Sequence, residues 1–134
     1  MDKVIKLNSL IVMFLTTVML VSCTSDMTQS LGGGYVYCDE GGPMKDIYCE
    51  DPKGKEVPAT VVDYAYDSNY IVAKQLPKIP QEILYSKQYE YKDEKAFYYW
   101  IVVKKTYDVY GPLDIHDYKE LKRKLGISNE LDIK

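Results

Sequence analysis

Histidine is almost absent from this chain, which has only one, His116, among 134 residues. A zinc site needs a set of about four Cys, His or acidic ligands, and a catalytic histidine needs a nucleophile or a substrate held beside it. One histidine and the two cysteines beyond residue 23 do not complete such a set, and no Ser or Cys elbow motif accompanies His116. We therefore expect no metal, no cofactor and no catalytic residue.

Positive charge is also scarce, with 17 Lys and Arg against 20 Asp and Glu and a formal net charge of −3. Nucleic-acid binding normally requires clustered Lys and Arg, so this balance argues against a nucleic-acid partner. The one basic cluster, residues 119–124, falls in the last turns of a predicted helix, where basic side chains complement the helix dipole and face water. Contact with anionic lipid headgroups is the alternative reading.

The chain has no apolar run long enough for a comfortable membrane span. The longest, residues 10–21, has about a dozen residues, whereas a helix needs roughly 20 to cross a bilayer. Lys3 and Lys6 precede this run. A short charged region followed by a short apolar one predicts a secretory signal peptide.

The four residues that end this run, Leu20-Val21-Ser22-Cys23, resemble the lipobox of bacterial lipoproteins. The resemblance implies that Cys23 is acylated, becomes the first residue of the mature protein and anchors it to a lipid bilayer. Thr24 follows the cysteine, which by resemblance to the best-known sorting rule suggests the outer membrane of a Gram-negative cell envelope. The alternative is an ordinary secretory signal with a coincidental cysteine.

Three segments follow from this reading. Residues 1–22 are the predicted signal peptide, and residues 23–33, rich in Ser, Thr, Gln and Gly, are a predicted lipidated flexible tether. Residues 34–134 are long enough for one small domain.

Two cysteines remain once Cys23 is lipidated. Cys38 and Cys49 flank a turn-rich stretch, residues 39–44, between two strand-like segments. An exported domain lies where disulfides persist, so we expect a Cys38–Cys49 disulfide; two buried free thiols are the alternative.

Period-two apolar patterns and turn signals predict a small α+β fold, an antiparallel sheet of four to six strands with one C-terminal amphipathic helix. The expected strands lie near residues 34–38, 46–50, 57–66, 70–76, 97–103 and 109–110. Residues 97–103 form the most apolar run of the predicted mature chain and the expected central strand, and a short helical turn is expected at residues 81–85. Asp114 is the predicted N-cap of the helix, which Gly126 ends.

Tyrosine is abundant, and all 14 tyrosines lie beyond residue 33. Tyrosine suits the half-exposed face of a sheet and is also enriched at binding surfaces. The tyrosines either fill the core of a small β domain or form an aromatic platform for a partner. Tyr98, Tyr99 and Trp100 are the candidate binding residues of such a platform.

Short motifs spread over residues 34–127 resemble a group of small, functionally uncharacterised bacterial lipoproteins. They are Gly34-Tyr35, Asp39-Glu40-Gly41, Ala73-Lys74-Gln75, Tyr99-Trp100-Ile101, Tyr110-Gly111-Pro112-Leu113 and Leu125-Gly126-Ile127. The resemblance implies a lipid-anchored single domain and assigns no activity.

Three hypotheses for function remain. The first is a non-catalytic envelope lipoprotein that binds another protein as an accessory module. The second is a glycan or small-ligand binding module that uses the Tyr/Trp surface, and the third is a hydrolase with a carboxylate pair that only the fold would bring together. An exposed aromatic patch would favour the first two, and a deep pocket with facing carboxylates the third.

Overall fold

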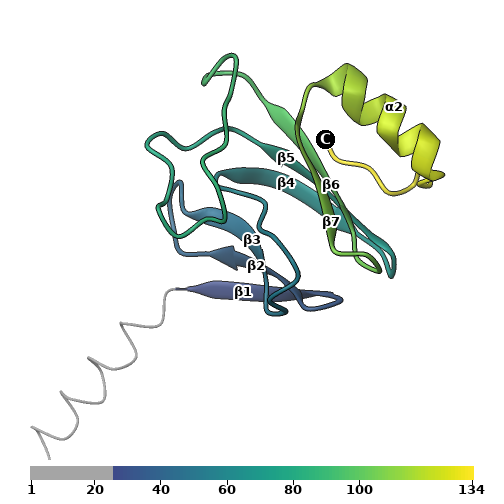
Figure 1. The fold of residues 1–134 in the computed structure, drawn as a ribbon, viewed down its shortest axis with the longest axis horizontal. Helices are drawn as coiled ribbons and strands as arrows, with labels where there is room; N and C mark the ends of the chain where they lie inside the picture. The colour runs from purple at the N-terminus through teal and green to yellow at the C-terminus, as the bar shows by residue number, and fades with distance from the viewer. Residues whose placement is uncertain (1–25) are drawn as a thin grey trace, which may run out of the picture.

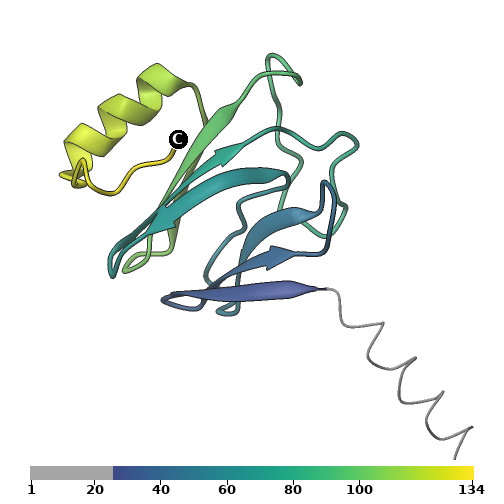
Figure 2. The same cartoon turned by 180° about the vertical axis from the view of Figure 1, so that it is seen from behind.

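The computed structural model describes residues 26–134, so the predicted signal peptide and Cys23 lie outside the described residues. Two antiparallel sheets and one helix are packed in three layers (Figures 1 and 2). Sheet A has the order β1-β2-β3, with β1 Met27–Gly32, β2 Tyr35–Asp39 and β3 Lys45–Cys49. Sheet B has the order β4-β5-β6-β7, with β4 Val61–Tyr66, β5 Tyr70–Gln75, β6 Tyr98–Val103 and β7 Asp108–Leu113. The helix, α2, spans Ile115–Leu125.

The α+β class is confirmed, but the expectation of a single sheet of four to six strands is wrong. The described part of the chain has seven strands, in sheets of three and four. Only one isolated bridge, between Ile47 and Val57, continues the pairing beyond β3. Ile47 and Trp100, from the two sheets, are both fully buried. Each sheet thus has an apolar inner face, and the sheets stack face to face because stacking buries both.

The predicted tether is shorter than expected, because β1 occupies most of it. The polar residues 28–30 predicted a linker, and the side chains of residues 27–30 are indeed exposed. The backbone of β1 nevertheless pairs antiparallel with β2, from Met27 opposite Asp39 to Gly32 opposite Tyr35, and the Leu31 side chain is buried. Backbone pairing with a neighbouring strand, which side-chain polarity does not report, decides this element.

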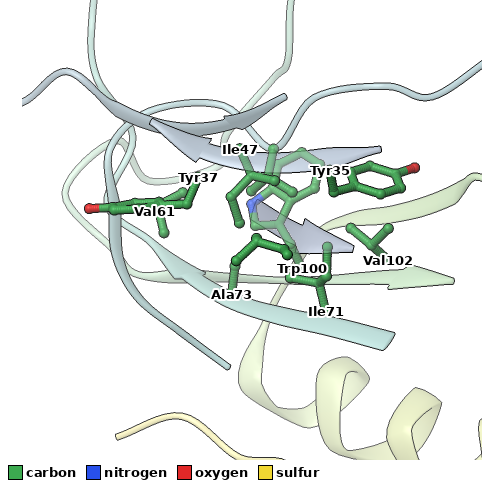
Figure 3. Packing of buried hydrophobic residues seen from close by; sticks show 10 residues of the cluster. Tyr35, Tyr37, Ile47, Val61, Ile71, Ala73, Trp100 and Val102 are labelled. Carbon is green, nitrogen blue, oxygen red and sulfur yellow. The ribbon is translucent and has the colours of Figure 1, made fainter. Parts of the chain in front are cut away.

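The main core lies between the sheets (Figure 3). Its buried members are Leu31, Tyr35, Tyr37 and Ile47 from sheet A, Val61, Ile71, Ala73, Trp100 and Val102 from sheet B, and Val57 between them. Alternate residues of β5 and β6, Val72 and Ile101, point to the other face and pack beneath α2. Sheet B is therefore apolar on both faces, and β6 is one of its two inner strands, as expected of the central strand.

Both helix caps are confirmed. The Asp114 side chain accepts a hydrogen bond from the Asp117 amide at 2.7 Å, and Gly126 has the left-handed conformation with φ 68°. The segment after the helix, residues 126–134, turns back across sheet B and buries Ile127 and Leu131. Residues 81–85, expected to form a turn of helix, contain none.

Lys104 joins the two sheets at one end. Its side chain is buried, and its ammonium group donates hydrogen bonds to the carbonyls of Leu31 and Asp67. A Cβ on Gly33 would lie 3.2 Å from the Lys104 side chain, so the turn after β1 packs tightly on it. Burial lowers the pKa of Lys104.

Candidate functional site

The expected aromatic platform does not form, because Tyr98, Tyr99 and Trp100 do not share a face. Neighbouring residues of a strand point to opposite sides of the sheet. Trp100 is 1% exposed in the core between the sheets, so it cannot contact a partner. Tyr98 is half-buried at the edge of the same face, and Tyr99 faces α2, where its ring stacks on Tyr118 at 5.0 Å. Of the three, only Tyr99 borders a groove.

Trp100 is held by a buried polar network. Its indole Nε1 donates to Gln75 Oε1 at 2.7 Å, and Gln75 Nε2 donates to the Ala59 carbonyl at 3.1 Å and to Tyr91 Oη at 2.8 Å. Tyr89 packs edge-on against the indole at 5.2 Å. A buried tryptophan needs an acceptor for its N–H, so this tryptophan is a structural residue.

The predicted Cys38–Cys49 disulfide is not formed, and both thiols are free. Cys38 pairs across the sheet with Asp46, whereas Cys49 pairs with Tyr35. The two cysteines are thus three residues out of register, about 10 Å along the strands, and their side chains point to opposite faces. That spacing exceeds the reach of a disulfide. Burial raises the pKa of both thiols, so neither is poised as a reactive thiolate.

The described residues contain no assembled catalytic set around the histidine. His116 is exposed in the first turn of α2, with its Nε2 3.9 Å from Glu120 Oε2. Asp117 and Glu120 are the only acidic groups clustered with it in the described chain, and all three lie on the outer face of the helix. The hollow that His116 lines with Lys119, Glu120 and Arg123 is shallow and open to solvent, so it does not enclose a substrate.

A groove runs between α2, β6 and the segment of residues 126–134, which we call the α2 groove. It has a volume of about 760 Å³. It is lined by Tyr99, Ile115, Tyr118, Lys119, Lys122, Arg123, Gly126, Ile127, Ser128, Asn129, Asp132, Ile133 and Lys134. Its size falls within the range of small-ligand sites, roughly 300 to 1,000 Å³.

Hydrogen bonds to residues 126–134 fix the shape of the α2 groove. Lys122 is buried and its ammonium donates to the Leu131 carbonyl at 2.6 Å, with Asp132 Oδ1 3.6 Å away. The Lys134 amide donates to Asp63 Oδ2 at 2.7 Å, and Lys74 donates to the Lys134 carbonyl at 3.3 Å. The wall opposite α2 is thus attached to both the helix and sheet B.

The α2 groove is basic, with four Lys or Arg side chains and a single acidic one. Lys119 and Arg123 are exposed, whereas Lys122 is occupied by its contacts with residues 131 and 132. At the floor, the Tyr118 hydroxyl is buried and has no hydrogen-bond partner among the described residues. Burial, with the nearby Asp132 carboxylate as a smaller cause, raises the pKa of Tyr118, so it is a donor at neutral pH. The arrangement offers two exposed cations, Lys119 and Arg123, beside two stacked aromatic rings.

A second feature is the connection between β5 and β6, residues 76–97, which we call the tyrosine loop. Tyr85 Oη donates to Asp46 Oδ2 at 2.7 Å and accepts from the Ala59 amide at 3.0 Å. Tyr89 Oη donates to Glu56 Oε1 at 3.0 Å, and burial raises its pKa to about 12. Since long loops without secondary structure are uncommon unless they serve a function, this ordered loop is a candidate interaction element.

The sequence could not reveal either feature. No local pattern linked Gln75 to Trp100 or Tyr85 to Asp46, because these hydrogen bonds join strands and loops far apart in the chain. The α2 groove had a partial signal, the basic run at 119–124, but only the fold shows that Lys122 is buried while Lys119 and Arg123 border a hollow.

The structure defines a small two-sheet α+β domain with one helix and a basic groove beneath it. Residues 44–134 match DUF3997, described as a protein of unknown function, and the chain belongs to this family. The match runs from just before β3 through α2 and residues 126–134, and so includes the α2 groove. The expectation of a functionally uncharacterised family is confirmed. No curated protein and no solved structure matches the chain.

Within residues 26–134, no helix combines the length and the apolar character needed to cross a membrane.

Proposed function

We propose that this protein is a lipid-anchored, non-catalytic binding module of the bacterial cell envelope, held to the membrane through an acylated Cys23. The lipobox-like residues 20–23 support the anchor, and Thr24 supports the outer membrane of a Gram-negative cell as its location. The partner on the membrane side is the bilayer, and on the other side an envelope protein.

The α2 groove is the proposed contact site for that protein. The observation that carries this is the combination of exposed Lys119 and Arg123 with the half-buried ring of Tyr99 in one hollow. Arginine and tyrosine are enriched in the energetic centres of protein interfaces, and basic groups attract acidic segments of a partner. An acidic peptide segment with an aliphatic or aromatic anchor is the chemistry that fits.

The anchor is tested by metabolic labelling with a fatty-acid probe. Cys23→Ala abolishes labelling and leaves the precursor uncut, whereas Cys38→Ser, the matched control, leaves both unchanged. Labelling that persists in Cys23→Ala excludes this anchor.

The groove is tested by cross-linking the tagged, lipidated protein in its native envelope and identifying what is recovered with it. Lys119→Glu with Arg123→Glu removes one partner protein from the recovered set, because the charge of the groove is reversed. Lys105→Glu with Lys92→Glu, an equal change of charge at exposed residues outside the groove, leaves recovery unchanged. Equal recovery with both pairs of substitutions excludes the groove as the contact site.

A second candidate function is binding of a glycan or another small ligand. The half-buried ring of Tyr99, which borders the groove, favours it, since flat aromatic groups pack on sugar rings. Recovery of glycan fragments without protein in the same experiment supports this function over the first.

A further inference from the structure

The tip of the tyrosine loop carries two adjacent aliphatic side chains, Ile83 and Leu84, that are almost fully exposed. Ile83 is 87% exposed and Leu84 is 92% exposed, the two highest values among the large apolar residues of the described chain. Scattered single apolar residues are normal on a surface, but two adjacent branched ones at a loop tip are not. Such a tip is expected to be covered when the protein works.

The tip is held rigidly on both sides. Before it, Lys78 and Glu82 form an ion pair at 2.8 Å. After it, the Ser86 amide and hydroxyl both donate to Glu56 Oε1, at 2.7 and 2.9 Å. The two arms of the loop are joined by Gln81, whose amide nitrogen donates to the Lys87 carbonyl at 2.7 Å. Ile83 and Leu84 are therefore presented outward by a fixed scaffold.

The tip lies at the end of the domain where β1 begins. Tyr85, next to the tip, bonds to Asp46. Asp46 pairs across sheet A with Cys38, and Cys38 pairs with Thr28, the second residue of β1. Two strand spacings, about 10 Å, separate Thr28 from Asp46. Figures 1 and 2 both show the beginning of β1 and the tyrosine loop at the same end, with α2 toward the opposite end.

The length of chain before β1 determines what this end faces. Four residue steps separate Cys23 from Met27, and at 3.3 to 3.6 Å per residue they span at most about 14 Å. An acyl chain on Cys23 would therefore keep Met27, itself 55% exposed, within about 14 Å of the bilayer. The bilayer would thus always lie close to the exposed tip, and a protein partner would have to compete with it for contact with Ile83 and Leu84.

We infer that Ile83 and Leu84 insert into the lipid bilayer beside the anchor and fix the orientation of the domain on the membrane. The inference rests on the proposed anchoring through Cys23. Insertion of the tip directs α2 and its groove away from the membrane, toward the aqueous space of the envelope. The second contact converts a flexible attachment into an oriented one without a transmembrane segment.

The test is quenching of tryptophan fluorescence by brominated lipid. The full chain, exported and processed in cells, is reconstituted into vesicles of phosphatidylethanolamine and phosphatidylglycerol with or without bromine on the acyl chains. The Leu84→Trp variant reports on the tip, and Ile83→Trp repeats the measurement at its neighbour. Lys105→Trp is the matched control, because it adjoins Lys104 at the other end of β1 from Met27. The buried Trp100 contributes the same background to all of them.

The tip variants are expected to lose most of their added emission in brominated vesicles, whereas Lys105→Trp loses none. Flotation of the vesicles reports the anchor separately. If the protein floats with the vesicles and both tip tryptophans stay unquenched, the insertion is excluded and the anchor stands. If the protein does not float, the anchor and the insertion both fail. A tip tryptophan that is unquenched in pure lipid but shifts to the blue in native envelopes assigns the tip to a protein and overturns the bilayer contact.

Discussion

Gln75 is the residue whose replacement tests the fold most directly. It is 0% exposed, and its side-chain amide makes three hydrogen bonds, to Trp100, Tyr91 and the Ala59 carbonyl. Gln75→Leu keeps the size and removes every polar partner. The Trp100 N–H is left buried without a partner. The Ala59 carbonyl still accepts from the Lys78 amide at 3.1 Å, and the half-buried Tyr91 hydroxyl can turn to water.

One orphaned buried group costs about 1 to 3 kcal/mol. The apolar leucine offsets part of this, which leaves an expected loss of about 1 to 2 kcal/mol in the free energy of unfolding. That is a measurable fraction of the roughly 5 to 15 kcal/mol of a typical domain. For a domain of about this size it corresponds to a fall in Tm of roughly 5 to 15 °C.

Urea denaturation of the unlipidated mature chain, with Cys23→Ser and followed by circular dichroism, measures this loss. Gln88→Leu, at an exposed position, is the matched control and should change the free energy of unfolding by less than about 0.5 kcal/mol. Because Gln75 and Trp100 are coupled, Gln75→Leu with Trp100→Phe should cost about 1 to 3 kcal/mol less than the sum of the single changes. A loss in Gln75→Leu no larger than in the control, or simple additivity in the double variant, would refute the reasoning.

Three further outcomes are expected. Gly111→Ala destabilises the fold by about 1 to 3 kcal/mol, because the new Cβ would lie 2.3 Å from the Trp100 indole; an unchanged urea midpoint would contradict that packing. Burial raises the pKa of Asp46 above its ordinary 3.8, so the folded state holds the proton more tightly than the unfolded state, and this contribution to stability is lost as pH rises through the folded pKa. Asp46→Asn, which still accepts from Tyr85, should therefore gain stability over the wild type as pH rises from 4 to 7, measured by urea titration at each pH; a constant difference would disprove the assignment. Both thiols of sheet A, Cys38 and Cys49, should react with a thiol reagent in denaturant without prior reduction. A shift in gel mobility on reduction would instead show that the two cysteines form a disulfide.

The short sequence motifs around the tryptophan acquire a physical meaning in the fold. The backbone of Gly111 on β7 packs directly against the indole of Trp100 on β6, and a Cβ at residue 111 would lie only 2.3 Å from the indole. Gln75, which ends β5, supplies the acceptor for the same indole. Three motifs that stand apart in the sequence thus form one packing unit of sheet B.

Local patterns in the sequence determined the local structure of sheet B and α2. The hairpin β4–β5, the central apolar strand and the helix with its Asp114 and Gly126 caps follow from side-chain periodicity and from hydrogen bonds within a few residues. The same signals also indicated one domain and, at the N-terminus, the predicted lipid anchor.

Tertiary structure alone decided the rest, because the decisive contacts join distant residues. The register of β2 on β3 separates Cys38 from Cys49, and backbone pairing turns an apparent linker into β1. Alternation along β6 buries Trp100 and sends Tyr99 to the other face, so adjacent aromatic residues could not form one surface. The α2 groove and the exposed tip at Ile83 and Leu84 exist only because segments far apart in the chain fold back on sheet B and sheet A, and no local pattern encodes that geometry.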